Sequence, residues 1–293
     1  MAVERLDVAV VGAGLSGAAA ARELTARGHS VLVLEQHEVG HDRGSSHGSS
    51  RIYRRAYTDP TYIALTGRAD DEWARLEEES GVRLRTRTGG LDAGHRAQVI
   101  HDVLRAHGLP TTLLRAEEVG ERWPGIALEG PACFHPDAGH LDPALTVSTL
   151  LDLATRSGAE LREHTSGGDG GPEPAYKIGQ FDSDTSTTAS GRDGVVDDRA
   201  RRATRAFVER QLPGLDPRPV AEQSCLFTMT SDEDFVLDRA TAGGGHVVVA
   251  SPCSGHGAKF APLIGVLVAD LVEGGAPHPR FAFRRGGPAG GHA

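Results

Sequence analysis

The 293-residue sequence lacks several features that define other broad classes of protein. No apolar run approaches the roughly 18 residues needed to span a bilayer, and the first residues show no basic segment followed by a long apolar one. We therefore expect neither a membrane helix nor a secretory signal. The three cysteines form no C-x-x-C pair and no even-numbered framework, which is typical of a reducing compartment. We expect a cytoplasmic protein and assign no metal site.

Acidic residues outnumber basic ones, and lysine is almost absent. The formal net charge is -9, which does not favour binding to the phosphates of nucleic acids. Of the 31 basic residues, 29 are arginine, and the two lysines are Lys177 and Lys259. An ammonium and a guanidinium are not interchangeable in a small binding pocket. From composition alone, two surface lysines are the simpler interpretation, but the sequence around them indicates a role.

The chain begins with the complete pattern of a dinucleotide-binding βαβ unit. Residues 6–11 predict a buried strand, an alanine-rich segment up to Arg27 predicts a helix, and residues 31–35 predict a second, parallel strand. The turn between the first strand and the helix contains Gly12, Gly14, Leu15, Ser16 and Gly17. Its glycines permit a tight turn, the approach of a pyrophosphate and close packing of the helix on the strand. Glu35, followed by Gln36, lies 18 residues after Gly17, where it would bind a ribose.

The polar segment 41–57 follows this unit and bears on the choice of cofactor. The glycine pattern indicates an ADP-containing cofactor without separating FAD from NAD. Segment 41–57 is small, polar and basic, unlike the amphipathic helix expected next in an NAD-type domain. It offers donors to an anionic flavin ring or a substrate carboxylate, whereas a solvated basic loop is the simpler alternative. The segment carries Gly44, Ser45, His47, Arg51 and Arg54.

The rest of the chain predicts a mixture of helices and short strands, with a second glycine turn near the end. Residues 166–174 and 182–194 have the composition of turns and linkers. A buried parallel strand over 246–250 is expected to lead into the second turn, Ser-Gly255-His256-Gly257-Ala-Lys259-Phe, and then into an apolar helix over 262–272. The other expected helices are 61–80, 98–106, a short one within 113–123, 143–156 and 197–212, and the other expected strands are 84–91, with a break at Gly89-Gly90, and 225–229.

Four segments resemble the flavoproteins related to monomeric sarcosine oxidase and N-methyltryptophan oxidase. They are GAGLSG, SSHGSSRIYRRAY, SCLFTMTSDEDFVLD and SGHGAKF, in that order along the chain. The resemblance implies an α/β protein with a Rossmann-like FAD-binding domain of the glutathione-reductase-like ββα type and an interleaved, truncated α+β substrate domain. We expect the FAD-binding domain in residues 1–80, 144–170 and 245–285, and the substrate domain in residues 81–143 and 171–244.

The resemblance also implies roles for individual residues. FAD would be attached through a thioether to Cys225, although a lone cysteine is by itself more often a buried structural residue, the interpretation that Cys133 and Cys253 keep. Lys259 and Arg54 would hold a substrate carboxylate, Lys177 would promote reaction with oxygen, and His47, Arg51 and His256 would line the active site. The implied FAD contacts are Gly12, Gly14, Leu15, Ser16, Gly17, Glu35, Gln36, Gly44, Ser45, Arg51, Cys225, Gly255, Gly257 and Lys259.

The implied reaction is oxidation of the secondary amine of an N-alkyl amino acid to an imine, with O2 reduced to hydrogen peroxide. We expect a monomer that takes a small-molecule amino acid and O2 and has no nucleic-acid or membrane partner. Family members have more chain between the elements matching residues 161–165 and Tyr176-Lys177, where this sequence has a Gly-, Pro- and Asp-rich stretch. The family histidine after Lys-x-Gly has no counterpart, since Gln180 and Phe181 follow. Two alternatives therefore stay open: an inactive homologue that retains at most nucleotide binding, and an NAD-dependent oxidoreductase.

Overall fold

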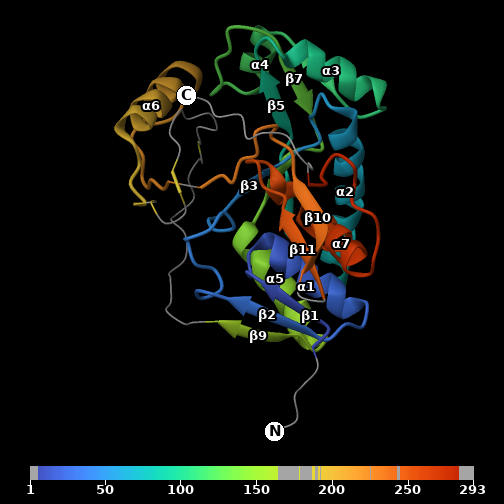
Figure 1. The fold of residues 1–293 in the computed structure, drawn as a ribbon. Coiled ribbons are helices and arrows are strands. Elements are labelled where there is room, and N and C mark those ends of the chain that lie inside the picture. The colour runs from blue at the N-terminus through green and yellow to red at the C-terminus, as the bar shows by residue number, and fades with distance from the viewer. Residues whose placement is uncertain are drawn as a thin grey trace. The chain divides into compact units, whose positions relative to one another are not determined.

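The computed structural model describes residues 6–163, 178, 187–188, 191, 193–224, 226–242 and 245–283 (Figure 1). The chain divides into two compact units, each assembled from separate stretches of sequence. Unit 1 contains residues 1–40, 147–166 and 227–293, and unit 2 contains residues 41–146 and 167–226. Lys177 and Cys225, two of the predicted site residues, lie outside the described residues. Among the described helices, none has the length and apolar character that crossing a membrane requires.

Unit 1 is built on a parallel sheet of three strands. Strands β1 (Val8–Val11), β2 (Val31–Glu35) and β9 (Glu160–Glu163) pair in the order β1-β2-β9 and lie side by side in Figure 1. Helix α1 (Leu15–Ala26) connects β1 to β2, and helix α5 (Pro143–Arg156) precedes β9. The parallel pairing of β1 with β2 across a helix confirms the predicted βαβ unit.

The second half of unit 1 contains an antiparallel hairpin, where the prediction for residues 246–250 is wrong. Strand β10 (Val236–Ala242) pairs antiparallel with β11 (Gly245–Ser251), and Val247 and Val249 are 46% and 36% exposed. Adjacent strands joined by so short a connection pair antiparallel, because a parallel partner needs a crossover of a dozen or more residues. The chain continues through the 3-10 helix η1 (Gly257–Phe260) into helix α7 (Ala261–Val272).

Two other strand predictions also need correction. Strand β1 is not fully buried, because Val11 is 85% exposed and β2 is its one neighbour in the described part of the sheet. Residues 226–229, expected as a strand, have no strand pairing. Their alternating apolar side chains resemble a strand pattern, but Phe227 and Met229 are exposed and no neighbouring strand satisfies the backbone.

Unit 2 contains two antiparallel sheets. Strands β3 (Arg51–Tyr53), β8 (Gly139–Leu141) and β4 (Arg85–Arg87) form one in the order β3-β8-β4. Strands β5 (Gly90–Ala93), β7 (Ala132–His135) and β6 (Thr112–Leu114) form the other in the order β5-β7-β6. The predicted strand over 84–91 is therefore two strands in different sheets, divided as expected near Gly89, which has a φ of +76°.

The helices of unit 2 lie where the sequence predicts them. They are α2 (Pro60–Ser80), α3 (Ala97–Ala106), α4 (Ala116–Arg122) and α6 (Asp198–Gln211). Local residues set the ends of α2: the Asp59 carboxylate accepts a hydrogen bond from the Thr61 N–H at 2.8 Å, and Gly81 ends the helix with a φ of 69°. Ile100 and Leu104 of α3 are buried in a cluster that includes Cys133 of β7.

The limits of the two units differ from the expected domain limits, most extensively over two stretches. Residues 41–80, expected in the FAD-binding domain, belong to unit 2. There Arg85 of β4 pairs with Asp70 and Glu77 of α2. Residues 227–244, expected in the substrate domain, belong to unit 1, where β10 within this stretch pairs with β11.

Candidate functional site

The first glycine turn has the geometry that its sequence requires. Gly12 has a φ of +97°, in the left-handed region that favours glycine. A Cβ atom at Gly17 would lie 1.8 Å from the Gly12 carbonyl oxygen, so the turn accepts no side chain there. Helix α1 begins after Gly14 with no side-chain hydrogen bond at its N-cap and no acidic residue in its first turn. The positive end of the helix is therefore available to an anionic group.

Glu35 ends β2 and is tied to this turn. Its Oε2 atom accepts a hydrogen bond from the Ala13 N–H at 2.7 Å, and its Oε1 atom accepts one from the His37 N–H at 2.9 Å. A carboxylate has about four acceptor positions, so such an anchored group can also accept hydrogen bonds from ribose hydroxyls. Gln36 lies beside it, with its side-chain nitrogen 3.0 Å from the ring of His37. Turn, helix and acid together fit the ADP part of a dinucleotide.

The second glycine turn, after β11, is also shaped by close backbone approaches. A Cβ atom at Gly257 would lie 1.6 Å from the Pro252 carbonyl oxygen. Ser254 and Gly255 have φ angles of +39° and +70°. The Ser254 hydroxyl donates to the Asp234 carbonyl oxygen at 2.9 Å, and the Ser254 N–H donates to the Thr228 carbonyl oxygen at 2.8 Å. The turn is thereby held against residues 228–234.

His256 and Lys259 lie on this second turn. The His256 ring stacks on Phe235 with the ring centres 4.9 Å apart, and its Nε2 atom lies 3.1 Å from the Glu233 carbonyl oxygen. Lys259 is 6% exposed, and its Nζ atom donates to the His256 carbonyl oxygen at 2.7 Å. The amino group of Lys259 is thus anchored by a backbone carbonyl at the second turn, where its remaining donor positions can reach an anionic ligand.

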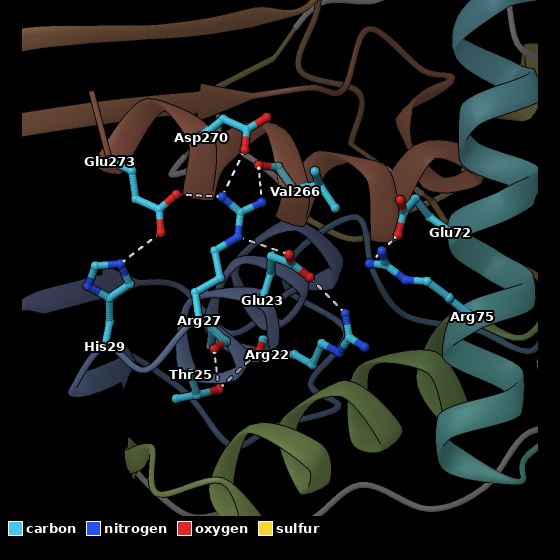
Figure 2. A network of polar contacts seen from close by, with 11 residues as sticks. Arg22, Glu23, Thr25, Arg27, His29, Glu72, Arg75, Val266, Asp270 and Glu273 are labelled. Carbon is cyan, nitrogen blue, oxygen red and sulfur yellow. Dashed lines mark hydrogen bonds and ion pairs between the residues drawn. The ribbon is translucent and has the colours of Figure 1, made fainter. Parts of the chain in front are cut away.

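The two glycine turns lie at the same end of a pair of parallel helices. Gly265 of α7 packs so closely on α1 that a Cβ atom there would lie 2.4 Å from the Ala19 carbonyl oxygen. Arg27, directly after α1, donates to Asp270 at 2.8 Å and to Glu273 at 2.7 Å, at the other end of α7 (Figure 2). One contact joins the first halves of α1 and α7 and the other joins their C-terminal ends, so together they show that the two helices run in the same direction. The N-termini of α1 and α7 therefore lie together, and two positive helix ends meet in unit 1.

In unit 2, the polar segment 41–57 contains hydrogen bonds from a side chain to its own backbone. Arg51 donates from Nη1 to the Ser50 carbonyl oxygen at 2.9 Å and from Nη2 to the Ser45 carbonyl oxygen at 3.0 Å. The Ser45 hydroxyl donates at 2.6 Å to the carbonyl oxygen of Leu226, the residue after Cys225. His47 is buried in the same segment. The structure thus places Ser45, which also accepts a hydrogen bond from Arg51, beside Leu226.

Arg54 follows β3, and its contacts involve two residues that the sequence analysis missed. Its Nη1 atom donates to the Ala56 carbonyl oxygen and lies 3.7 Å from Oδ1 of Asp92. Asp92 also contacts His135, with Oδ2 and Nε2 2.7 Å apart. Burial alone would raise the pKa of Asp92, but the contacts with His135 and Arg54 hold this pKa below its ordinary value. In the sequence, Asp92 and His135 are each a polar residue within a short strand. This feature is too common to identify them as site residues.

The predicted site residues thus divide between the two units. Unit 1 brings together Gly12, Gly14, Leu15, Ser16, Gly17, Glu35, Gln36, Gly255, His256, Gly257 and Lys259. Unit 2 holds Gly44, Ser45, His47, Arg51 and Arg54. Lys177 and Cys225 lie outside the described residues, so their roles stay predictions.

This combination of a βαβ nucleotide fold and a second glycine turn defines a dinucleotide-binding class of protein, and comparison with known families identifies the dinucleotide as FAD. A family described as FAD dependent oxidoreductase (DAO) matches residues 7–169 and 170–271. The chain belongs to this family, whose cofactor is FAD. The two matched parts meet at residues 169 and 170, within the segment where the sequence analysis places the shortening.

Similar proteins include several sarcosine oxidases, which confirms the resemblance predicted from the sequence motifs. Monomeric sarcosine oxidase of Streptomyces avermitilis is 29% identical over 369 aligned positions, covering 94% of this chain and 96% of that protein. Monomeric sarcosine oxidase of Bacillus sp. is 26% identical, covering 97% and 96%. The alignment with the Streptomyces protein has more positions than the 293 residues of this chain, so that relative carries segments that this chain lacks.

Solved structures of amino acid oxidases share the fold. NikD, an unusual amino acid oxidase, is similar with a TM-score of 0.80 and 23% identity over 96% of this chain and 98% of that one. Glycine oxidase from Geobacillus kaustophilus is similar with a TM-score of 0.73 and 19% identity over 97% of this chain and 100% of that one. The predicted α/β FAD-binding fold is thereby confirmed.

Proposed function

We propose that this protein oxidises the C–N bond of an N-methyl or other secondary amino acid, using O2 as the electron acceptor. The amine would lose two electrons and two protons to become an imine, and O2 would gain them to become hydrogen peroxide. Water would then hydrolyse the imine to a primary amine and an aldehyde. When bound, FAD supplies the two-electron chemistry that the side chains of the protein do not provide.

The residues of unit 1 would hold the cofactor. The N–H groups at the start of α1, next to Gly12 and Gly14, would bind the diphosphate, and the Glu35 carboxylate would accept hydrogen bonds from the ribose. The second turn, with Gly255 and Gly257, would contribute the positive end of α7 at the same place. We further propose that Cys225 forms a thioether with a methyl group of the flavin, in which the S–H and one C–H bond would be lost and O2 would take up the two electrons. Supporting this, Ser45, in the segment predicted to line the flavin, donates a hydrogen bond to the carbonyl oxygen of the adjacent Leu226.

The cationic residues would bind and orient the amino acid. Lys259 and Arg54 would pair with its carboxylate, since an ammonium and a planar guanidinium both form strong, charge-assisted hydrogen bonds with carboxylates. His47, Arg51 and His256 would line the site around the reacting amine, and Lys177 would stabilise negative charge that develops on oxygen. We also propose that the protein acts as a cytoplasmic monomer, in keeping with relatives that are named monomeric.

The observation that carries this proposal is the pair of glycine turns at one end of two parallel helices, in a chain of the FAD dependent oxidoreductase family. The test is to purify the protein, record its absorption spectrum and measure peroxide with sarcosine, N-methyltryptophan and pipecolate as substrates. Flavin absorption with peroxide formation supports the proposal. A folded protein without flavin would overturn it, and flavin without peroxide from any secondary amino acid would favour an inactive homologue.

The covalent link requires a separate test. After acid precipitation, flavin should stay with the protein pellet in the wild type and appear in the supernatant in Cys225→Ser. Cys253→Ser, which changes another thiol, is the matched control and should retain its flavin in the pellet. Flavin that remains attached in Cys225→Ser, or that leaves the wild-type pellet, would show that Cys225 forms no such link.

A further inference from the structure

Arg54 lies at the end of a chain of polar contacts that runs from His135 through Asp92. We propose that Asp92 and His135 are positioning residues, which orient the Arg54 guanidinium for the carboxylate of the amino acid substrate. This inference rests on the proposed function, because it assigns Arg54 the role of carboxylate ligand. All three residues belong to unit 2, so the contacts lie within one compact body.

The contacts of Arg54 constrain one edge of its guanidinium. Both of its polar contacts among the described residues involve Nη1, which donates to the Ala56 carbonyl oxygen and lies 3.7 Å from Asp92. The guanidinium carbon also lies 5.3 Å from the centre of the Tyr57 ring, close enough for a cation–π interaction. Because these contacts involve one nitrogen and one face, the remaining nitrogens can form the parallel pair of hydrogen bonds that a carboxylate accepts from arginine.

Asp92 is itself held so that its carboxylate does not occupy the position proposed for the substrate carboxylate beside Arg54. Its Oδ2 atom lies 2.7 Å from Nε2 of His135, which leaves Oδ1 as the oxygen nearer Arg54. At 3.7 Å this second contact is an attraction between charges rather than a short hydrogen bond. If His135 did not hold Oδ2, the carboxylate could rotate and bind the guanidinium with both oxygens, which would compete with the substrate.

The strand register explains why His135 stands where it does. Gly90 of β5 pairs directly with His135 of β7, so Asp92, two residues along β5, is a diagonal neighbour on the same face of the sheet. A Cβ atom at Gly90 would lie 2.7 Å from Cε1 of His135. The imidazole therefore occupies the space above a glycine and reaches across to Asp92. His135 is buried, which fixes its ring further.

The test compares a charged and a neutral substrate in variants of the flavin-containing enzyme. In Asp92→Ala and His135→Phe, we expect KM for sarcosine to rise about tenfold, with kcat changed by less than about twofold, because a misdirected arginine weakens the carboxylate contact. The kinetics with N-methylglycinamide, which lacks the carboxylate, should not change. Asp137→Ala is the matched control, since Asp137 is a more exposed carboxylate paired weakly with Arg87, and it should leave both substrates unaffected.

A double-mutant cycle separates positioning from a general loss of structure. In an Arg54→Ala background, Asp92→Ala should cause no further rise in KM for sarcosine, because the residue through which it acts is gone. Asp92→Asn, which keeps the shape of the side chain, replaces Asp92→Ala should that variant not fold, with the same expected selectivity. If wild-type enzyme oxidises sarcosine but Asp92→Ala and Asp92→Asn leave KM unchanged or lower it, this inference is wrong. If wild type oxidises no secondary amino acid, the proposed function itself is wrong.

Discussion

Arg85 lies between α2 and the β3-β8-β4 sheet with a side chain that is 8% exposed. It donates to Asp70 and, at 2.8 Å, to Glu77. A cation so nearly removed from water is tolerated because two carboxylates surround it. We therefore regard this cluster, rather than the many surface ion pairs of this arginine-rich sequence, as the main electrostatic contribution to the stability of unit 2.

Replacement of Arg85 should reveal this contribution. In Arg85→Met, we expect the free energy of unfolding at pH 7 to fall by about 3 kcal/mol, because two partly buried carboxylates lose their cation. Urea denaturation measures the change. Arg75→Met is the matched control: that side chain is 54% exposed and pairs with Glu72, so its loss should cost less than about 1 kcal/mol. Equal losses in the two variants would contradict this account of Arg85.

The same cluster predicts a dependence on pH. Burial would raise the pKa of Asp70 and of Glu77, but the hydrogen bonds from Tyr53 and Arg85 to Asp70, and from Arg85 to Glu77, hold both pKa values below the ordinary range. Groups with a lowered folded-state pKa stabilise the protein above their unfolded pKa, and this stability is lost as the pH falls through the folded value.

The difference in unfolding free energy between wild type and Arg85→Met should therefore be largest at pH 7 and shrink below about pH 4, as the carboxylates are protonated. Urea denaturation at a series of pH values would measure it. A difference that stayed constant or grew toward acid pH would show that Arg85 acts through packing rather than through its charge.

At the scale of elements, the close contact between α1 and α7 depends on Gly265, which has no side chain. In Gly265→Ala, the new methyl group would lie 2.4 Å from the backbone oxygen of Ala19, so the helices must separate. We expect a loss of about 2–3 kcal/mol in unfolding free energy. Gly120→Ala in α4 is the control, because nothing lies within 4 Å of its new methyl group, and it should be neutral or stabilising by up to about 1 kcal/mol. A stabilised Gly265→Ala would mean that the helices are less closely packed than described.

The elements also show what a single sequence can predict. Helix α2 was predicted because its signal is local, namely apolar residues at helical spacing, and the caps at Asp59 and Gly81 in the structure agree with that position. The first glycine turn was predicted for the same reason. Strand β11 was placed correctly but predicted to be buried and parallel, because a run of valines specifies extended backbone and not the direction of the strand beside it.

The site was predictable to the extent that its chemistry follows from motifs. Glu35 was identified by its distance along the chain from Gly17, and its contact with the glycine turn agrees with that position. The contact between Asp92 and His135 was not foreseen, because 43 residues separate them and it depends on the register of β5 with β7. A register is set by packing across strands, which one sequence does not display.

For the molecule as a whole, the cofactor should contribute to stability. Cys225→Ser protein freed of flavin should gain about 2.7 kcal/mol in unfolding free energy when free FAD is a hundred times its Kd, because a ligand that binds only the folded state stabilises it by mass action. Chemical denaturation with increasing FAD measures this gain, and NAD at the same concentrations is the control ligand. Stabilisation by NAD and not by FAD would support the NAD-dependent alternative instead.

The parallel arrangement of α1 and α7 has an electrostatic consequence. Two dipoles that point the same way side by side repel each other, so this packing carries a cost that antiparallel helices avoid. At the C-terminal ends, the guanidinium of Arg27 places one positive charge among the carboxylates of Glu23, Asp270 and Glu273 and so reduces the accumulated negative charge. At the N-terminal ends of α1 and α7, the dianionic diphosphate of the nucleotide would offset the accumulated positive charge. The nucleotide would then be a counterion for the architecture of unit 1 as well as its ligand.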